Sequence, residues 1–456
     1  MSASPLVSTP TVGSFTREAF EAHLANVSHL PAWWLDRKRA AYERFASLPM
    51  PVRSDEFWRF SNLSRLTLDG FEPAAPVVFK DLVHESVGVT GAGHLVFANG
   101  RLVATEPLPA ELTARGVVFD TIQNAFANHG ALVREHLLAQ PARLGSAKFA
   151  ALHEAFLDDG AFIHVPKGVE LELPVGVFHY AVGASAAVFP HTLVIAGENS
   201  KITVSDFFRS AAPKPGEGGS FPGPQTPEPG PQFACGGNDL YAGHGSQVEY
   251  IAMQDWSRDT LSFQFNATVA RRDARVLALN LHSGGRQSRH ESFSQLQAPG
   301  AHSEMLALTI AHGDQEFDQR TLQIHQAPNT SSNLLYKNAL LETSKTIFSG
   351  LIIVDPDAQK TDAYQSNRNL ILSEDAEANS LPGLEIQAND VRCTHGATSS
   401  RIPAEQEFYL RSRGINPALA QELIVFGFFE EIVGKIANTE LHDQLAAIIR
   451  RKFKEQ

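Results

Sequence analysis

The pair Cys393 and His395 is the clearest metal-type signal in the chain, because a thiolate and an imidazole both bind soft metal ions such as iron or zinc. The two residues stand two positions apart in Cys393-Thr394-His395. In a strand, residues i and i+2 point to the same side, so both side chains could reach one ion. Two ligands do not close a site, so a metal here would need further ligands from elsewhere, such as another subunit. The spacing also fits an apolar buried cysteine beside a hydrogen-bonded histidine.

A second set of candidate residues, five histidines and three acidic residues, lies upstream between residues 282 and 325. They are His282, His290, His302, His312, His325, Asp314, Glu316 and Asp318. If this region is a β-helix with about 20–25 residues per turn, His290 would stack with His312, and His302 with His325. The alternating carboxylates could be the acid and base of a polysaccharide lyase or glycosidase. Histidines at turn corners and the solvated face of a strand are the structural alternatives.

Motifs of nucleotide-binding and hydrolytic enzymes are missing from the sequence. It contains no GxxxxGK[ST] loop, no GxGxxG that opens a helix, no GxSxG and no HExxH. The segment GHGSQ at 243–247 resembles none of them. The usual interpretations as a hydrolase or nucleotide enzyme therefore lack support.

The candidate residues lie in a region whose pattern is typical of β-strands. Short β-type runs follow one another from about residue 160 to about residue 390. One of them, RVLALNLH at 275–282, alternates, with Val276 and His282 on one side and the three leucines between them on the other. No long amphipathic helices separate the runs, which argues against a doubly wound α/β sheet and leaves a sandwich, a barrel or a β-helix.

Helical segments flank this β region on both sides. Apolar residues recur at helical spacing at 15–24, 31–48 and 121–157, and the NG pair at 99–100 predicts a tight hairpin turn. After the β region, helices are expected at 403–413, from the cap Asn416 and Pro417 onward, and after a cap at Thr439. The expected organisation is a mostly helical N-terminal domain (1–150), a β core (151–402) and a helical C-terminal domain (403–456). The Pro/Gly-rich segment 211–231 predicts a flexible loop within the core.

Composition limits the classes of function. The 456 residues are 43% hydrophobic and carry a net charge of −12, so we expect a sizeable core and no nucleic-acid partner. No apolar stretch approaches the roughly 20 residues of a membrane helix, so we expect no membrane contact. The two cysteines, Cys235 and Cys393, exclude a disulfide scaffold and a Cys₄ zinc site within one chain. Together with an uncharged N-terminal stretch that lacks signal-peptide features, they favour the reducing cytoplasm.

Longer segments resemble the SufB/SufD family of iron–sulfur cluster assembly proteins, and its SufD members most. They are VRCTHGATSSRIPAEQEFYLRSRGI (391–415), ALAQELIVFGFFEEIVGKI (418–436), NLLYKNALLETSKTIFSGLIIVDPDAQKTDAYQSNRNLIL (333–372), FIHVPKGVELELPV (162–175) and RSDEFWRFSNL (53–63). The resemblance covers nearly the whole chain except the N-terminal tail and the Pro/Gly loop. It implies a right-handed parallel β-helix between helical N- and C-terminal domains.

The resemblance also implies partners and a non-catalytic role. SufD-type members pair with SufB through the β-helix, and each of the two carries one copy of the ATPase SufC on its C-terminal helices. The complex builds nascent clusters and passes them to carriers. This chain is thereby expected to be a scaffold subunit, with a transient iron–sulfur cluster at its interface with SufB and no cofactor bound tightly to the isolated chain. Exposed strand edges would also permit the isolated chain to form a homodimer.

The same resemblance assigns the metal-site residues. His395 matches the family's histidine ligand, and Cys393 matches a cysteine of other SufD-type proteins. A functional cysteine of SufB falls at about the place of Ser366 and Asn367, and a SufB glutamate falls at Gly396, so this chain lacks both. It would therefore lend His395 to a site shared with SufB, with Cys393 as the weaker candidate.

The ATPase contact is expected, again by resemblance, in the C-terminal helices. Its candidate residues are Phe408, Leu423, Phe426, Phe429 and Glu430. Phe426, Phe429 and Val433 stand three and four residues apart and so share one helix face, and Gly427 favours the close approach of another backbone. The alternative is that this face packs on the β-helix. A carbohydrate-active β-helix enzyme and a purely structural binding module are the competing functions.

Overall fold

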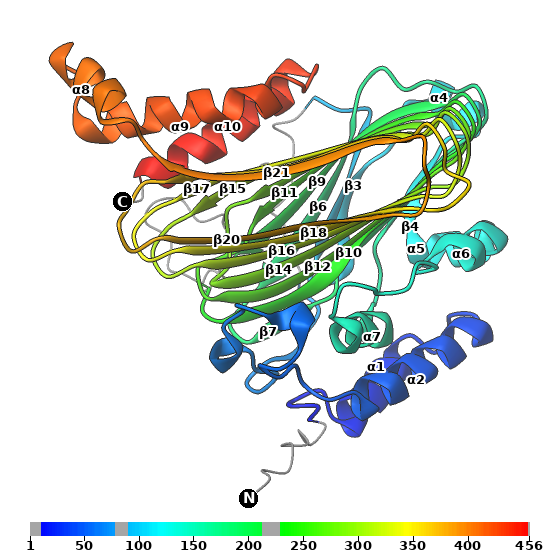
Figure 1. Cartoon of the computed structure of the whole chain (residues 1–456). Helices are drawn as coiled ribbons and strands as arrows, with labels where there is room; N and C mark the ends of the chain where they lie inside the picture. Colours follow the sequence, from blue (N-terminus) through cyan, green and yellow to red (C-terminus); the bar gives the residue numbers. More distant parts are fainter. Residues whose placement is uncertain (1–10, 78–89, 212–228, 455–456) are drawn as a thin grey trace, which may run out of the picture.

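The protein is a parallel β-helix of two facing sheets, with helices from the N- and C-terminal parts of the chain packed on its outer faces (Figure 1). The structure, a computed structural model, describes residues 11–77, 90–211 and 229–454. The Pro/Gly-rich loop expected at 211–231 falls mostly on residues 212–228, outside the described part. The β-helix expected for the core is confirmed.

From β8 onward the chain alternates between the two sheets, so that successive strands lie in opposite sheets. The first sheet consists of β1 (Glu72–Pro73), β4 (Val118–Thr121), β5 (Ala161–Val165), β7 (Ala186–Val188), β8 (His191–Ala196), β10 (Gln232–Ala242), β12 (Thr260–Ala270), β14 (Gln287–Leu296), β16 (Glu316–His325), β18 (Lys345–Val354) and β20 (Glu377–Ile386). The second consists of β2 (Gly93–Ala98), β3 (Arg101–Glu106), β6 (Val175–Val182), β9 (Lys201–Ala211), β11 (Gln247–Asp255), β13 (Arg275–His282), β15 (His302–Ala311), β17 (Ser331–Leu340), β19 (Asp362–Ile371) and β21 (Arg392–Arg401). Strands pair in parallel, apart from the antiparallel pairs β2–β3 and β4–β5.

In the described part of the chain, the helices come before β5 or after β21. They are α1 (Arg17–Asn26), α2 (Ala32–Ser47), η1 (Glu56–Trp58), η2 (Leu63–Arg65), α4 (Ala110–Ala114), α5 (Ile122–Asn128), α6 (Gly130–His136), α7 (Ala147–Phe156), α8 (Ala404–Ser412), α9 (Pro417–Val433) and α10 (Thr439–Lys454). The expected hairpin is also present, since Asn99 and Gly100 between β2 and β3 both have positive φ, 49° and 75°. No helix within the described residues is long and apolar enough to cross a membrane.

Each turn of the β-helix is longer than the sequence suggested. Arg275 pairs with His302, and His302 pairs with Ser331, so these turns take 27 and 29 residues instead of the roughly 20–25 assumed. The predicted stacking of His290 on His312 and of His302 on His325 is therefore wrong. His290 lies across the interior from His282, with ring centroids 3.6 Å apart. Burial lowers the pKa of both imidazoles.

The alternation of β13 sorts its residues as predicted. Ala278 and Asn280 line the interior between the sheets, whereas Leu279 and Leu281 pack outward against α9 and α10. The interior contains many hydrogen-bonded polar side chains. Asp206 is fully buried there and accepts hydrogen bonds from the hydroxyls of Thr192 and Tyr250, both at 2.6 Å. Burial raises the pKa of Asp206 to about 7, although both hydrogen bonds lower it.

The shift at Asp206 predicts a pH-dependent stability. The pKa of Asp206 is about 7 in the folded chain and 3.8 in the unfolded chain, so between these pH values the folded chain holds a proton on Asp206 that the unfolded chain has released. The stability that this proton provides is fully present below pH 3.8 and is lost as the pH rises through 7. We expect Asp206→Asn, which keeps the acceptor oxygen, to be more stable than the parent at pH 8 by roughly 1–4 kcal/mol, with the gain vanishing near pH 4. Urea unfolding across this pH range measures it, with the exposed Asp375→Asn as control. An equal difference at both pH values would contradict the prediction.

The N-terminal helices pack on the outer face of the first sheet, and α9 and α10 cover the outer face of the second (Figure 1). On the first sheet, aromatic side chains dominate the contact. The rings of Phe149 in α7 and Phe263 in β12 stack with centroids 3.8 Å apart. On the second sheet, Phe429 and Val433 of α9 are buried against Leu279 and Leu306. The β-helix thus supports two helical layers on opposite faces.

The three acidic residues near the middle of the chain fasten the N-terminal segment to the first sheet. Asp318 is buried and accepts hydrogen bonds from Ser61 Oγ, Arg289 Nη1 and Arg320 Nε, each at 2.6 Å. Glu316 is buried and accepts from the backbone N–H of Asn62 at 2.9 Å. Asp314 pairs with Arg65 at 2.9 Å. The hypothesis that these carboxylates are the acid and base of a carbohydrate-active enzyme is wrong. Their oxygen atoms are already bound by the N-terminal segment and by arginines, so they do not face a substrate.

The helix caps follow the sequence with one exception. The Asn416 side chain accepts a hydrogen bond from the Leu419 N–H at 2.8 Å, with Pro417 at the first position of α9, as predicted. At α10 the expected cap Thr439 is wrong. Asn438 Oδ1 accepts from the Leu441 N–H at 3.0 Å, because the helix begins at Thr439, one residue earlier than the cap prediction assumed.

Candidate functional site: the open last turn and the C-terminal helices

The β-helix ends in an open turn formed by β20 and β21. Among the strands of the described residues, β20 pairs with β18 alone and β21 with β19 alone, so each forms a sheet edge. Both edges are ten residues long. Unpaired backbone N–H and C=O groups along such an edge can pair with a strand of another chain. Within the described part of the chain no element covers this end (Figure 1).

Cys393 and His395 both stand on β21, on the side that faces the interior. Cys393 packs beside Leu384 and Val391 at the edge of an apolar cluster. Burial raises the pKa of the Cys393 thiol, and the nearby Asp362 adds to this, so the thiol stays protonated near neutral pH. His395 is exposed. The two residues therefore differ in accessibility: the imidazole of His395 is exposed, whereas the thiol of Cys393 is half-buried and protonated.

Behind His395 lies Gln365, which sequence reasoning missed. The two residues are register partners on β21 and β19, and Gln365 is fully buried. Its Nε2 donates to the Gly350 carbonyl at 3.3 Å, which orients the amide, whereas its Oε1 and the nearby Thr321 hydroxyl have no hydrogen-bond partner among the described residues. Gly350 leaves room for both, since a Cβ there would lie 2.6 Å from Gln365 Oε1. The buried side chains behind His395 are thus polar, and two of their oxygen atoms lack a hydrogen-bond partner among the described residues.

Ser366, Asn367 and Gly396, the positions singled out by the family resemblance, have ordinary surroundings here. Ser366 and Asn367 on β19 are register partners of Gly396 and Ala397. Asn367 Oδ1 accepts from Ser380 at 2.6 Å, which ties β19 to β20. A Cβ at Gly396 would meet nothing within 4 Å, so the absence of an acidic side chain there is not forced by packing.

The candidate residues of the C-terminal helices divide between two faces. Leu423 and Glu430 are exposed, at 46% for Leu423, and Phe408 on α8 is 73% exposed. Phe426 is half-buried beneath the Arg450 guanidinium, 5.4 Å from its ring centroid. Phe429 is wholly buried against the second sheet. The expectation that Phe429 shares an exposed face with Phe426 is therefore wrong, because Val425, Phe429 and Val433 form the stripe that packs inward.

The outward face of α9 is continuous and open. Leu419, Leu423, Gly427 and Glu430 recur every three or four residues and so lie on one side. A Cβ at Gly427 would meet nothing within 4 Å, so no backbone among the described residues approaches it closely. This face is available to a second molecule.

Ion pairs that the sequence analysis overlooked hold α9 on the β-helix. The buried Lys337 ammonium on β17 donates to the Phe428 carbonyl at 2.6 Å and pairs with Glu431 at 2.6 Å. Arg368 on β19 reaches the same Glu431 at 3.0 Å. A lysine between Leu335 and Ala339, in the outward row of β17, was the available signal, since a charge in a buried row needs a partner. These ion pairs link α9 to β17 and to β19, and β19 is the strand that pairs with β21 of His395.

The metal-binding capacity of the described residues is small. No group of three His, Cys, Asp or Glu side chains in residues 11–77, 90–211 and 229–454 could hold a metal ion. The open turn offers one exposed imidazole beside free strand edges. Such an arrangement can supply one ligand to a site that another chain completes.

Fold and open turn together define the class: a parallel β-helix protein with helical layers on both outer faces and an uncovered last turn. Two family models match it in succession. Residues 18–177 match the SufBD protein N-terminal region, and residues 179–428 match the SUF system FeS cluster assembly SufBD core domain. The chain belongs to the SufB/SufD family of iron–sulfur cluster assembly proteins.

Similar proteins carry matching names. An iron–sulfur cluster assembly SufBD family protein of Synechocystis is 30% identical over 422 residues, which covers 90% of this chain and 89% of that protein. The iron–sulfur cluster assembly protein SufD of Bacillus subtilis is 27% identical over 93% of this chain and 95% of its own length. SufB of the same organism is 24% identical over 91% and 88%. The resemblance found from the sequence motifs is confirmed over most of the chain.

Proposed function

We propose that this chain is a SufD-type scaffold subunit of an iron–sulfur cluster assembly complex, without catalytic activity of its own. The observation that carries the proposal is the exposed His395 on an open strand edge in a chain of this family. In this proposal SufB pairs with the chain at the open turn and supplies the remaining ligands. The nascent cluster is the cargo of this shared site.

The chemistry of the open turn supports a loosely held cluster. An imidazole is a weaker ligand for iron than a thiolate, and a site divided between two chains is opened when the chains separate. Cys393 is the poorer candidate because its side chain is half-buried beside Leu384 and Val391, whereas His395 is exposed. We therefore assign His395 as the ligand from this chain and Cys393 as part of the apolar support of β21.

Pairing with SufB through the edges of β20 and β21 fits their geometry. The two edges lie at the same end of the β-helix, and each exposes a row of unpaired backbone groups. Two β-helices that meet end to end would continue both sheets across the interface. In the absence of SufB the same edges would allow two copies of this chain to pair.

Co-expression of this chain with its SufB and SufC counterparts tests the proposal as a whole. We expect a stable complex whose mass accounts for all three chains and which gains iron and sulfide under reducing conditions. The isolated chain should gain neither in stoichiometric amount. Failure of the three proteins to associate would overturn the proposal.

The ATPase contact is proposed on the outward face of α9 and on α8, around Leu423 and Phe408. Aromatic and aliphatic anchors at the centre of an interface each contribute roughly 2 kcal/mol or more. We expect Leu423→Asp to weaken SufC binding by at least about 30-fold while the thermal stability of the chain stays unchanged. Calorimetric titration of the purified chain with SufC measures this.

A control is available in the N-terminal segment. Val52 is 38% exposed, against 46% for Leu423, and lies beside α7 on the side of the first sheet, away from the C-terminal helices on the second. Val52→Asp should leave SufC binding intact. Undiminished binding by Leu423→Asp, or an equal loss in Val52→Asp, would contradict the assignment.

A further inference from the structure

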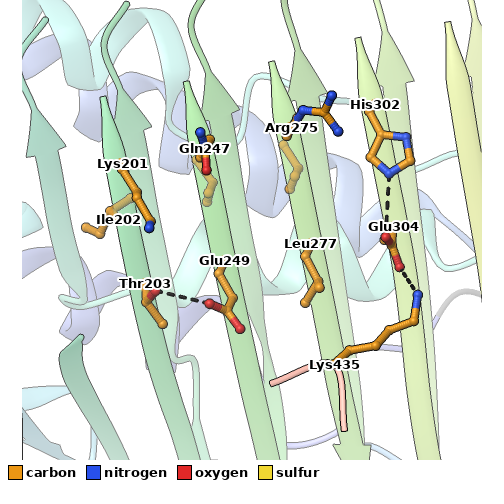
Figure 2. Close-up of a pocket in the computed structure, with 12 residues that line it drawn as sticks. Lys201, Ile202, Thr203, Gln247, Glu249, Arg275, Leu277, His302, Glu304 and Lys435 are labelled. Carbon is orange, nitrogen blue, oxygen red and sulfur yellow. Dashed lines mark hydrogen bonds and ion pairs between the residues drawn. The ribbon is translucent and has the colours of Figure 1, made fainter. Parts of the chain in front are cut away.

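A charged groove on the outer face of the second sheet lies apart from the open turn. Its floor is formed by β9, β11, β13 and β15, and its volume is about 230 Å³ (Figure 2). Register places Lys201, Gln247, Arg275 and His302 in one row across these strands. Two residues further along, the second row consists of Thr203, Glu249, Leu277 and Glu304. Lys435, from the connection between α9 and α10, closes one end.

The two carboxylates of the groove differ in their partners. Glu304 pairs with the Lys435 ammonium and lies 3.6 Å from His302 Nε2, and these groups lower its pKa to about 2. Glu249 accepts one hydrogen bond, from the Thr203 hydroxyl at 3.2 Å, and forms no ion pair within the described part of the chain. Burial raises the pKa of Glu249, whereas Thr203 and the charge of Lys201 lower it. A half-buried carboxylate without a cation has unused binding capacity.

The first row supplies the opposite charge. Lys201 and Arg275 are exposed, stand on either side of Gln247, and form no ion pair with a carboxylate of the described residues. An ammonium and a guanidinium flanking an amide can bind one carboxylate, the guanidinium with two parallel hydrogen bonds. Leu277 lies half-buried between the charged positions and offers an apolar contact.

Opposite unpaired charges on adjacent rows fit a small ligand that carries both signs. We propose that this groove binds a free α-amino acid, with its carboxylate toward Lys201 and Arg275, its ammonium toward Glu249 and its side chain against Leu277. In an α-amino acid the ammonium and the carboxylate are attached to the same carbon atom. Hydrogen bonds of about 3 Å from these two groups bridge the first and second rows of the groove. The groove is large enough for such a ligand and too small for most cofactors.

This inference is independent of the proposed role of His395 and is tested on the isolated full-length chain. Each proteinogenic amino acid is added at about 10 mM in a thermal-shift assay, and those that stabilise the chain are titrated by calorimetry. We expect at least one to bind with a Kd of about 1 mM or lower. Its analogues without the ammonium or without the carboxylate should bind at least about tenfold more weakly, since each loses one charged partner.

Variants of the groove identify the binding residues. Glu249→Gln and Arg275→Gln should each weaken binding at least about tenfold, whereas Glu111→Gln and Arg115→Gln, the same changes at exposed positions around α4, should not. No binding by any amino acid, or binding unaffected by Glu249→Gln, would overturn the proposal. Inorganic phosphate that binds through Arg275 when amino acids do not would show a simple anion site and would overturn it equally.

Discussion

His395→Ala should leave the chain folded and able to pair with SufB, while the assembled complex loses most of its iron and sulfide. The side chain is exposed on β21, so its removal opens no cavity and breaks no hydrogen bond that holds the strand. If His395 is one of few ligands at a divided site, its loss should lower cluster affinity by at least roughly tenfold, because even the hydrogen-bond partners of metal ligands contribute that much. Iron and acid-labile sulfide per complex, with the visible absorbance of the cluster, measure the effect.

Two variants serve as controls for this experiment. His244→Ala removes an exposed histidine from the β10–β11 turn and should leave the iron content unchanged. Cys393→Ser should have the smaller effect of the two β21 substitutions, because its thiol is neutral and packs against apolar neighbours. Normal iron and sulfide in the His395→Ala complex would remove the ligand assignment and favour a purely structural binding module. A larger loss in Cys393→Ser would transfer the assignment to the thiol.

Phe429→Asp should destabilise the packing of the C-terminal helices by roughly 4 kcal/mol or more. The ring is wholly buried between α9 and the second sheet, so the substitution creates a cavity and places a carboxylate in it. We expect the helices to detach while the β-helix persists, because its strands pair with one another independently of α9. Hydrogen exchange along α9 and α10, compared with exchange along β12 to β16, measures this directly.

The comparison with Leu423→Asp separates packing from partner binding. Both variants should lose SufC, but only Phe429→Asp should lose exchange protection in α9. Retained protection in Phe429→Asp would show that its ring is not required for docking of the helices. Phe429→Leu, which keeps an apolar side chain, should restore most of the protection.

Local patterns in the sequence predicted much of the fold correctly. The alternation in residues 275–282 separated interior from exterior positions, and the NG pair marked the hairpin turn. The Asn416-Pro417 pair marked the start of α9. These signals are local, since side-chain alternation, turn dihedrals and helix caps depend on residues within a few positions of one another. The motifs of the last third also identified the family, which the comparisons confirmed.

Other features of the sites depend on contacts between residues far apart in the chain. Apolar residues of α9 recur at spacings that fit two overlapping faces, so only the docked helix shows that Phe429 packs inward and Leu423 outward. Asp318 has the sequence context of a solvated strand, yet Ser61 and two arginines bury it. Gln365 became relevant because β19 is the register partner of β21.

By itself, the sequence determined the strand-rich core, the flanking helices, the family and the two candidate ligands Cys393 and His395. Only the tertiary structure decided the length of a β-helix turn, the partners of the buried charges and which of these two ligands is exposed. The physical reason is that periodicity specifies which side of an element a residue occupies, whereas burial and pairing depend on what packs against that side. On β21 the alternation places both side chains on the side that faces the interior of the open last turn. Apolar neighbours partly bury Cys393, whereas His395 remains exposed to solvent.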